Sequence, residues 1–240
     1  MRGILGAVLA SSLVLATGLF GSETQAPDEI RVGDQTYFIA TEPLASFLEQ
    51  HPDALPSSEV VSSYNWRGYI ATWRLADDKL LLEDVRMMTI AAADPRAPAD
   101  TQWRSVLEVL FPKGGPQQAT WFSGYLIVPT GTLQENVRLG YKLAYSTYLV
   151  ARVEKGAVTS QREMDWNAFQ VFRGEQFARF KTTPAFGQLV EHLRSLYPQK
   201  TAKEHEDHLF EFGTPHYLYR IGDDGADAAR QGPAPPPDKV

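Results

Sequence analysis

A dense group of ionisable side chains, KEHEDH, occupies positions 203–208. If this stretch is helical, His205 and His208 are three residues apart and share a face, so both imidazoles could bind one Zn²⁺ or Cu²⁺ ion. Such a site needs a further protein ligand, and the remaining histidines are His51, His192 and His216. The same composition is typical of a solvated, charged linker. The pattern therefore indicates a metal-assisted hydrolase as the alternative function, and no cofactor is predicted outside that hypothesis.

Arginine and aromatic side chains form a second candidate set, which could bind a ligand without any bond-making step. In residues 64–87, strand alternation places Arg67, Tyr69 and Trp73 on one face and Arg74 on the other. Tyr and Trp offer large, stiff contact surfaces with one polar group, which suits a protein, peptide or glycan partner. Further rings fall in the same strand-rich region: Trp66, Trp121, Tyr125, Tyr141, Tyr145 and Tyr148. Alternatively, the rings fill the core and the two arginines extend along its rim to water.

Arg173 interrupts an aromatic face. On a helix over 165–180, five aromatic rings lie within an arc of about 140° around the helix axis. They are Trp166, Phe169, Phe172, Phe177 and Phe180. Arg173 falls inside the same arc. An arginine among rings can stack on them while it binds an anion or a carboxylate. It can also extend past them to water, which is the expected outcome.

Several chemistries lack their residues or motifs. The chain has no cysteine, no Gly-x-Gly-x-x-Gly, no Walker loop and no His-Glu-x-x-His. Glu83 and Asp84 are neighbours on an expected strand, so they should point to opposite faces and not share acid–base work. The net charge of −6 comes from interspersed residues, and no basic cluster indicates nucleic acid as a partner. The favoured hypothesis is therefore a non-enzymatic binding module that uses an aromatic-rich sheet surface.

The first residues resemble a secretory signal peptide. Arg2 precedes the apolar run 4–20, and Thr24-Gln25-Ala26 provides small residues at the positions that signal peptidase prefers. We expect residues 1–26 to be cleaved and the protein to be periplasmic or extracellular, without membrane association after cleavage. The alternative is that the segment is retained as an anchor, although the run is short for a ~30 Å hydrocarbon core.

Residues 27–221 are expected to form a single α+β domain. Its sheet is predicted to be mainly antiparallel and hairpin-rich, with two C-terminal amphipathic helices packed on it. The predicted strands are 30–40 with a turn at 33–34, 67–85 with a turn at 77–78, 119–129, a long strand region over 137–162 with a turn at 154–156, and a final strand-like segment 208–221. The predicted helices are 42–50, 101–111, 165–180 and 183–197. Residues 222–240 have the composition of a disordered tail.

Four motifs give a resemblance to an uncharacterised bacterial family. They are WRGYIATW at 66–73, LFP at 110–112, WFSG at 121–124 and LGY at 139–141. The resemblance covers roughly residues 60 to 160. It implies no activity, cofactor or catalytic residue, because the motifs consist of residues that typically pack a sheet.

Overall fold

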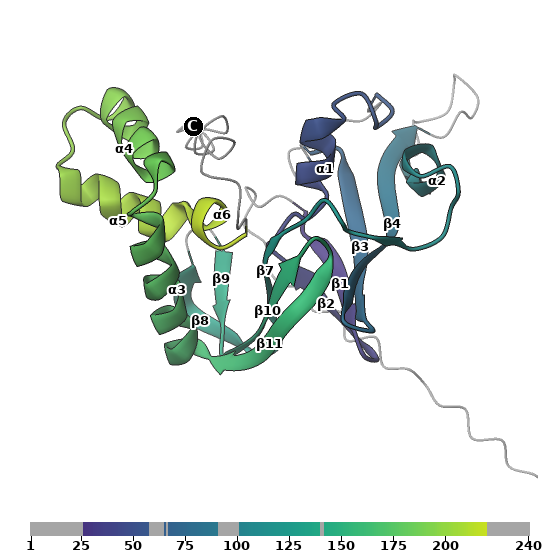
Figure 1. Cartoon of the computed structure of the whole chain (residues 1–240), viewed down its shortest axis with the longest axis horizontal. Coiled ribbons are helices and arrows are strands. Elements are labelled where there is room, and N and C mark those ends of the chain that lie inside the picture. The colour runs from purple at the N-terminus through teal and green to yellow at the C-terminus, as the bar shows by residue number, and fades with distance from the viewer. Residues whose placement is uncertain (1–25, 58–64, 66, 91–100, 140–141, 220–240) are drawn as a thin grey trace, which may run out of the picture.

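The structure, a computed structural model, describes residues 26–57, 65, 67–90, 101–139 and 142–219 (Figure 1). Its mixed, mostly antiparallel sheet with several helices confirms the α+β class. The expected signal peptide, apart from Ala26, and the expected disordered tail lie outside the described residues. Within the described residues, no helix is both long enough and apolar enough to span a bilayer.

Nine strands of the described part form one sheet, and two form another. The main sheet follows the order β2-β1-β3-β4-β11-β10-β7, with β5 and β6 also paired to β4; β1 and β3 are parallel, and the other pairs are antiparallel. The strands are β1 Asp28–Val32, β2 Gln35–Ile39, β3 Tyr69–Ala76, β4 Lys79–Ile90, β5 Thr101–Ser105, β6 Gln117–Gln118, β7 Gly124–Pro129, β10 Thr147–Glu154 and β11 Ala157–Asp165. The smaller sheet pairs β8 Leu133–Leu139 with β9 Lys142–Tyr145.

Two tight turns agree with the sequence prediction. Asp77 and Asp78 join β3 to β4 with φ angles of 50° and 54°, and Lys155 and Gly156 join β10 to β11 with φ angles of 47° and 77°. Two central residues with positive φ define the turn whose twist matches that of the flanking strands. Asp and Gly are favoured there because they tolerate the left-handed conformation.

The main sheet curls so that its two ends meet around one core. The Thr41 hydroxyl, just after β2, donates to the carbonyl oxygen of Tyr125 over 3.3 Å and accepts from the amide of Ile127 on β7 over 3.4 Å. The inward side chains of the strands fill the interior, including Ile30, Trp73, Leu82, Leu126 and Ala151. Short helices α1 Ala45–Gln50 and α2 Leu107–Leu110 lie beside this part of the sheet.

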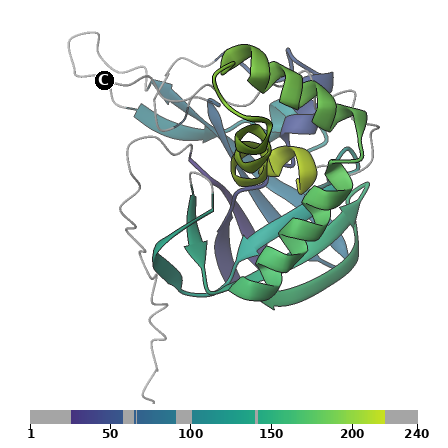
Figure 2. The same cartoon turned by 90° about the vertical axis from the view of Figure 1, so that its left-hand side faces the viewer.

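A second core lies between the outer face of β7, β10 and β11 and the C-terminal helices (Figure 2). The helices are α3 Trp166–Phe180, α4 Pro184–Leu196, α5 Ala202–Phe212 and α6 Thr214–Tyr217. Asp165, Thr183 and Thr201 accept from backbone amides as N-caps, and Thr201 forms a capping box with Glu204. The prediction of two C-terminal helices is wrong in number, because α5 and α6 follow α4.

Three other segments also differ from prediction. Residues 101–105 are strand β5, because β4 pairs with them, and only Leu107–Leu110 is helical. The predicted long strand is divided at Ser146, where β9 leaves for the smaller sheet and β10 for the main one. The predicted final strand, 208–221, is instead occupied by the end of α5, which a capping box at Thr201 starts upstream, and by α6; residues 220–221 lie outside the described residues.

Candidate functional site

A β-bulge places two neighbouring carboxylates on the same face of β4. Thr72 pairs with Asp84 and Trp73 pairs with Leu82, so Glu83 is an extra residue in the ladder. The buried positions before and after the bulge are Leu82 and Val85, and both residues between them therefore point outward. The prediction that Glu83 and Asp84 point to opposite faces is wrong.

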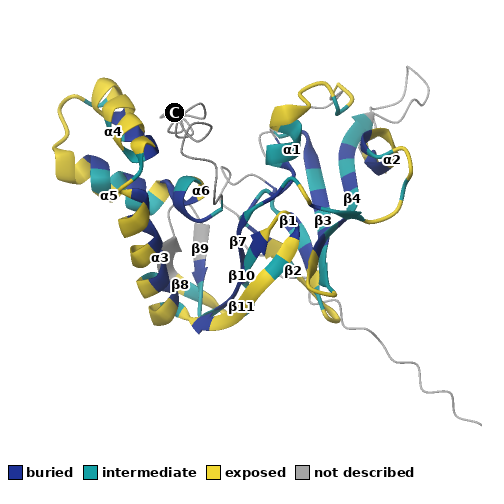
Figure 3. Cartoon of the chain, viewed as in Figure 1, coloured by how far each residue is buried: buried dark blue, intermediate teal, exposed yellow. Residues whose placement is uncertain are grey.

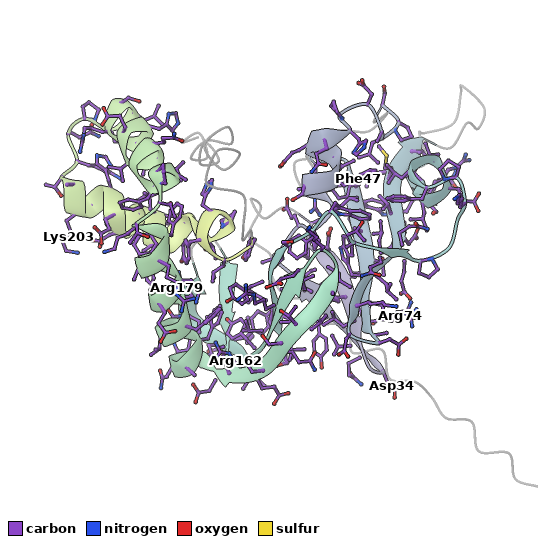
Figure 4. All side chains as sticks on the ribbon, viewed as in Figure 1. Asp34, Phe47, Arg74, Arg162, Arg179 and Lys203 are labelled. Atoms are coloured by element: carbon purple, nitrogen blue, oxygen red, sulfur yellow. The ribbon has the colours of Figure 1, made fainter. Side chains whose placement is uncertain are left out.

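Both carboxylates line a groove of about 880 Å³ on the outer face of β1, β3 and β4. The strands contribute Glu29, Arg31, Thr72, Glu83, Asp84 and Arg86. The other wall includes Ser105 at the end of β5, Leu107, Glu108 and Val109 of α2, and Gly115. Arg74 is not a lining residue but forms an ion pair with Glu83, which is one. It lies on the side of the molecule away from α3 to α6 (Figure 4). The volume is within the range of small-ligand sites, about 300–1,000 Å³.

Two arginines share one carboxylate at one end of the groove. Arg31 forms an ion pair with Glu83 Oε2, and Arg74 Nε lies 2.7 Å from Glu83 Oε1. The side chains of Arg31 and Arg74 are 49% and 39% exposed, whereas that of Glu83 is 13% exposed. The anion is therefore the covered member, and both cations face solvent. We name these three residues the cationic triad.

The adjacent group has the reverse composition. Arg86 Nη2 donates to Glu29 Oε2 over 3.1 Å, and its Nε lies 3.9 Å from Asp84 Oδ2. The other oxygen of Asp84 accepts from the Ser105 hydroxyl over 2.6 Å and from the Val85 amide over 2.9 Å. These bonds fix the Asp84 carboxylate. We name Glu29, Asp84 and Arg86 the anionic triad.

Three predicted binding residues lie inside the curled sheet instead. Asp28, which is fully buried, accepts from Arg67 Nη2 over 2.7 Å, from Trp73 Nε1 over 3.0 Å and from the Ala71 amide over 3.1 Å. The Arg67 guanidinium lies 4.5 Å from the centre of the Tyr69 ring. Tyr69 and Trp73 are 2% and 0% exposed. Arg67, Tyr69 and Trp73 are therefore brought together, and Arg74 is separated from them on the outer face.

Burial has the largest effect on the pKa values of Tyr69 and Asp28 in this interior cluster. It raises the pKa of the Tyr69 hydroxyl, because the phenolate would be desolvated. Burial likewise raises the pKa of the Asp28 carboxyl, against the opposing effects of Arg67 and the two hydrogen bonds from Trp73 and Ala71. Arg67 also lies 3.4 Å from Glu42 and donates to the Ala26 carbonyl over 2.9 Å. The cluster is thus closely bonded and enclosed, which indicates a structural role.

Of the other rings that the sequence analysis singled out, Tyr125 and Tyr148 are buried, and Trp121 and Tyr145 are half-buried. Figure 3 shows the burial of each described residue along the strands and helices. Tyr148 stacks on Phe169 of α3 with ring centres 4.2 Å apart, and Tyr125 meets Phe172 edge-on. Trp121 is half-buried against Phe47. Trp66 and Tyr141 lie outside the described residues.

Arg173 is 1% exposed, so the expectation that it reaches water is wrong. Its Nη1 donates to Gln170 Oε1 over 2.8 Å, and its Nη2 donates to the Phe210 carbonyl over 3.0 Å and to the Tyr217 hydroxyl over 3.2 Å. The guanidinium also lies 4.5 Å from the centre of the Phe210 ring. These contacts join α3 to α5 and α6.

The two histidines of the metal hypothesis lie on α5. His205 is 1% exposed, and His208 is half-buried with its ring 4.8 Å from that of Phe212. Within the ranges that the structure describes, no group of three or more His, Cys, Asp or Glu side chains is placed to hold a metal ion. The further ligand that the hydrolase hypothesis requires is therefore not found in this part of the chain.

The sequence prediction missed most of the groove. Glu29 and Arg31 lie on β1, Arg86 on β4 and Ser105 on β5, and the pairings of β1 with β3, β3 with β4 and β4 with β5 bring them together. One local signal was present: Leu80 and Leu82 keep a two-residue apolar period, but the next apolar residue is Val85, three residues further on, and this interruption indicates a bulge.

No family model matches the chain, and no curated protein or solved structure matches it significantly. The resemblance over residues 60 to 160 therefore depends on its motifs alone, and the case for a function depends on the groove.

Proposed function

We propose that this chain is an exported, non-enzymatic binding module whose ligand, a peptide or glycan, occupies the groove on β1, β3 and β4. The observation that carries the proposal is the bulge at Glu83, which turns two carboxylates outward beside Arg31 and Arg86 around a volume of about 880 Å³. The alternative partner of the sequence analysis, a whole protein, would contact a wider surface than this groove.

The side chains of the groove are well positioned for selective binding. They project from paired strands, and ion pairs restrict their rotamers, so a ligand would meet a largely preformed site. Charges of both signs favour one ligand orientation and oppose like-charged competitors. Export is proposed from the pattern of residues 1–26 alone, and the charge distribution gives no reason to propose nucleic acid as a partner.

Thermal unfolding with a small ligand panel tests the proposal. The panel is L-alanyl-L-alanine for the peptide class and cellobiose for the glycan class, each in excess over the purified protein. A ligand that binds the folded state raises Tm in proportion to ln(1 + [L]/Kd). We expect at least one probe to raise Tm in the parent protein and not in Glu83→Gln or Arg86→Gln.

A matched control is Glu191→Gln, because Glu191 forms an exposed ion pair with Arg194 on α4, outside the groove. This variant should respond to the probe like the parent protein. A Tm increase that survives both groove variants, or the absence of any increase across the panel, contradicts the proposal.

A further inference from the structure

The charges of the groove are unequal at its two ends. The cationic triad has two arginines and one carboxylate, and the anionic triad has two carboxylates and one arginine. The first therefore keeps one unbalanced positive charge, and the second keeps one unbalanced negative charge. Glu108 on the α2 wall is a further carboxylate lining the groove.

The sheet register sets the separation of the two ends. Glu29 pairs with Thr72 and Arg31 pairs with Arg74, so the triads are two residues apart along β1 and β3. Two residues of a strand rise about 7 Å. Thr72 lies on the outer face at the level of the anionic triad, paired with both Glu29 and Asp84, and it also lines the groove.

This charge pattern complements a short zwitterion. Two residues of extended peptide span at most about 7 Å, with an ammonium at one end and a carboxylate at the other. A single amino acid is too short to reach both ends with its charged groups, and a neutral sugar would leave the unbalanced charges unused.

We propose that the ligand is an unblocked dipeptide, with its carboxylate bound by Arg31 and Arg74 and its ammonium bound by Glu29 and Asp84. This inference rests on the proposed function and specifies the ligand class for the same groove. Arg86 and Glu83 act as positioning residues, because each holds the two like-charged side chains of its triad apart and in place.

Isothermal titration calorimetry with three probes tests the two ends separately. The probes are L-alanyl-L-alanine, its N-acetyl derivative and its C-terminal amide. We expect the unblocked dipeptide to bind at least about fivefold more tightly than either blocked form, since about 1 kcal/mol for a half-exposed charge pair corresponds to that factor.

Two variants test which side chains of the groove bind the carboxylate of the dipeptide and which bind its ammonium. Arg74→Gln should weaken binding of the unblocked dipeptide about fivefold and leave the amide unchanged, and Glu29→Gln should weaken the unblocked dipeptide and leave the N-acetyl form unchanged. Arg194→Gln on α4 is the control and should change nothing. If Arg74→Gln does not fold, Arg31→Gln tests the same end.

Three results overturn the inference: equal binding of the three probes, no binding of the unblocked dipeptide, or equal effects of both variants on every probe. Cellobiose that raises Tm through the groove while the dipeptide does not bind would overturn the ligand class and leave the binding function standing. No binding by any probe would overturn both.

Discussion

Asp28 and Arg67 are 39 residues apart in the chain and form an ion pair of 2.7 Å inside the curled sheet. Their side chains are 0% and 6% exposed. Because Asp28 also accepts from Ala71 and Trp73, this one carboxylate connects the start of β1 to β3. The pair thus fixes the neighbouring strands that carry Glu29, Arg31, Thr72 and Arg74 on their outer face.

Asp28→Asn should destabilise the protein by about 3–5 kcal/mol, because it removes the fully buried carboxylate that pairs with Arg67 at 2.7 Å and leaves only the partly exposed Glu42 at 3.4 Å. Urea unfolding followed by tryptophan fluorescence measures the change. The matched control is Glu154→Gln, which removes a pair with Arg152 whose side chains are 51% and 40% exposed and should cost about 0–1 kcal/mol. A loss for Asp28→Asn no larger than that of the control would contradict a structural role for the pair.

Gly124→Ala should destabilise the protein by about 1–3 kcal/mol, because the added methyl group would overlap the carbonyl oxygen of Tyr219. The Tyr125 amide donates to the Leu218 carbonyl over 3.0 Å, so its hydrogen exchange should also accelerate. Gly174→Ala is the control: no atom lies within 4 Å of its added methyl group, and alanine on α3 should stabilise the protein by about 0.5–1 kcal/mol. Equal effects of the two substitutions would disprove close packing at Gly124.

His208 should make the protein less stable at acidic pH. Burial lowers the pKa of its imidazole below the ordinary 6.5, with smaller contributions from Lys200 and His205. Between that lowered pKa and 6.5 the unfolded chain binds more protons than the folded chain, so the free energy of unfolding falls as pH falls. NMR titration should give a pKa below 6.5, and His208→Asn should lose less stability than the parent between pH 7.5 and 5. A measured pKa of 6.5 or higher would refute this assignment.

Local sequence signals predicted the elements whose geometry depends on neighbouring residues. Asp77-Asp78 and Lys155-Gly156 satisfy the backbone demands of tight turns, and Thr183-Pro184 provides an N-cap and a first-turn proline for α4. These features could be predicted because each depends on a few consecutive residues.

Features that depend on strand partners could not be predicted in this way. Residues 101–105 form a strand because β4 supplies their hydrogen-bond partners. The groove depends on registers between β1, β3 and β4, which one sequence does not specify. Arg173 shows the same limit: its buried partners come from α5 and α6, distant in the chain.

Deletion of Glu83 should leave the fold intact and remove ligand binding. Without this residue, Leu82, Asp84 and Val85 follow a regular in-out-in alternation, while both arginines of the cationic triad lose their shared carboxylate. Circular dichroism and urea unfolding should reveal a loss of about 1–2 kcal/mol, the sum expected for two partly exposed ion pairs. Deletion of the buried Leu82 is the control and should abolish folding. An unfolded Glu83 deletion would mean that the bulge is required for the fold itself.

The most direct measurement is a ¹H–¹⁵N NMR titration of the protein with L-alanyl-L-alanine. We expect saturable amide shifts at Glu29, Arg31, Thr72, Asp84 and Arg86, with little change on α3 to α5. Shifts confined to the C-terminal helices, or no saturable shift at any of these five amides, would contradict the proposed binding site.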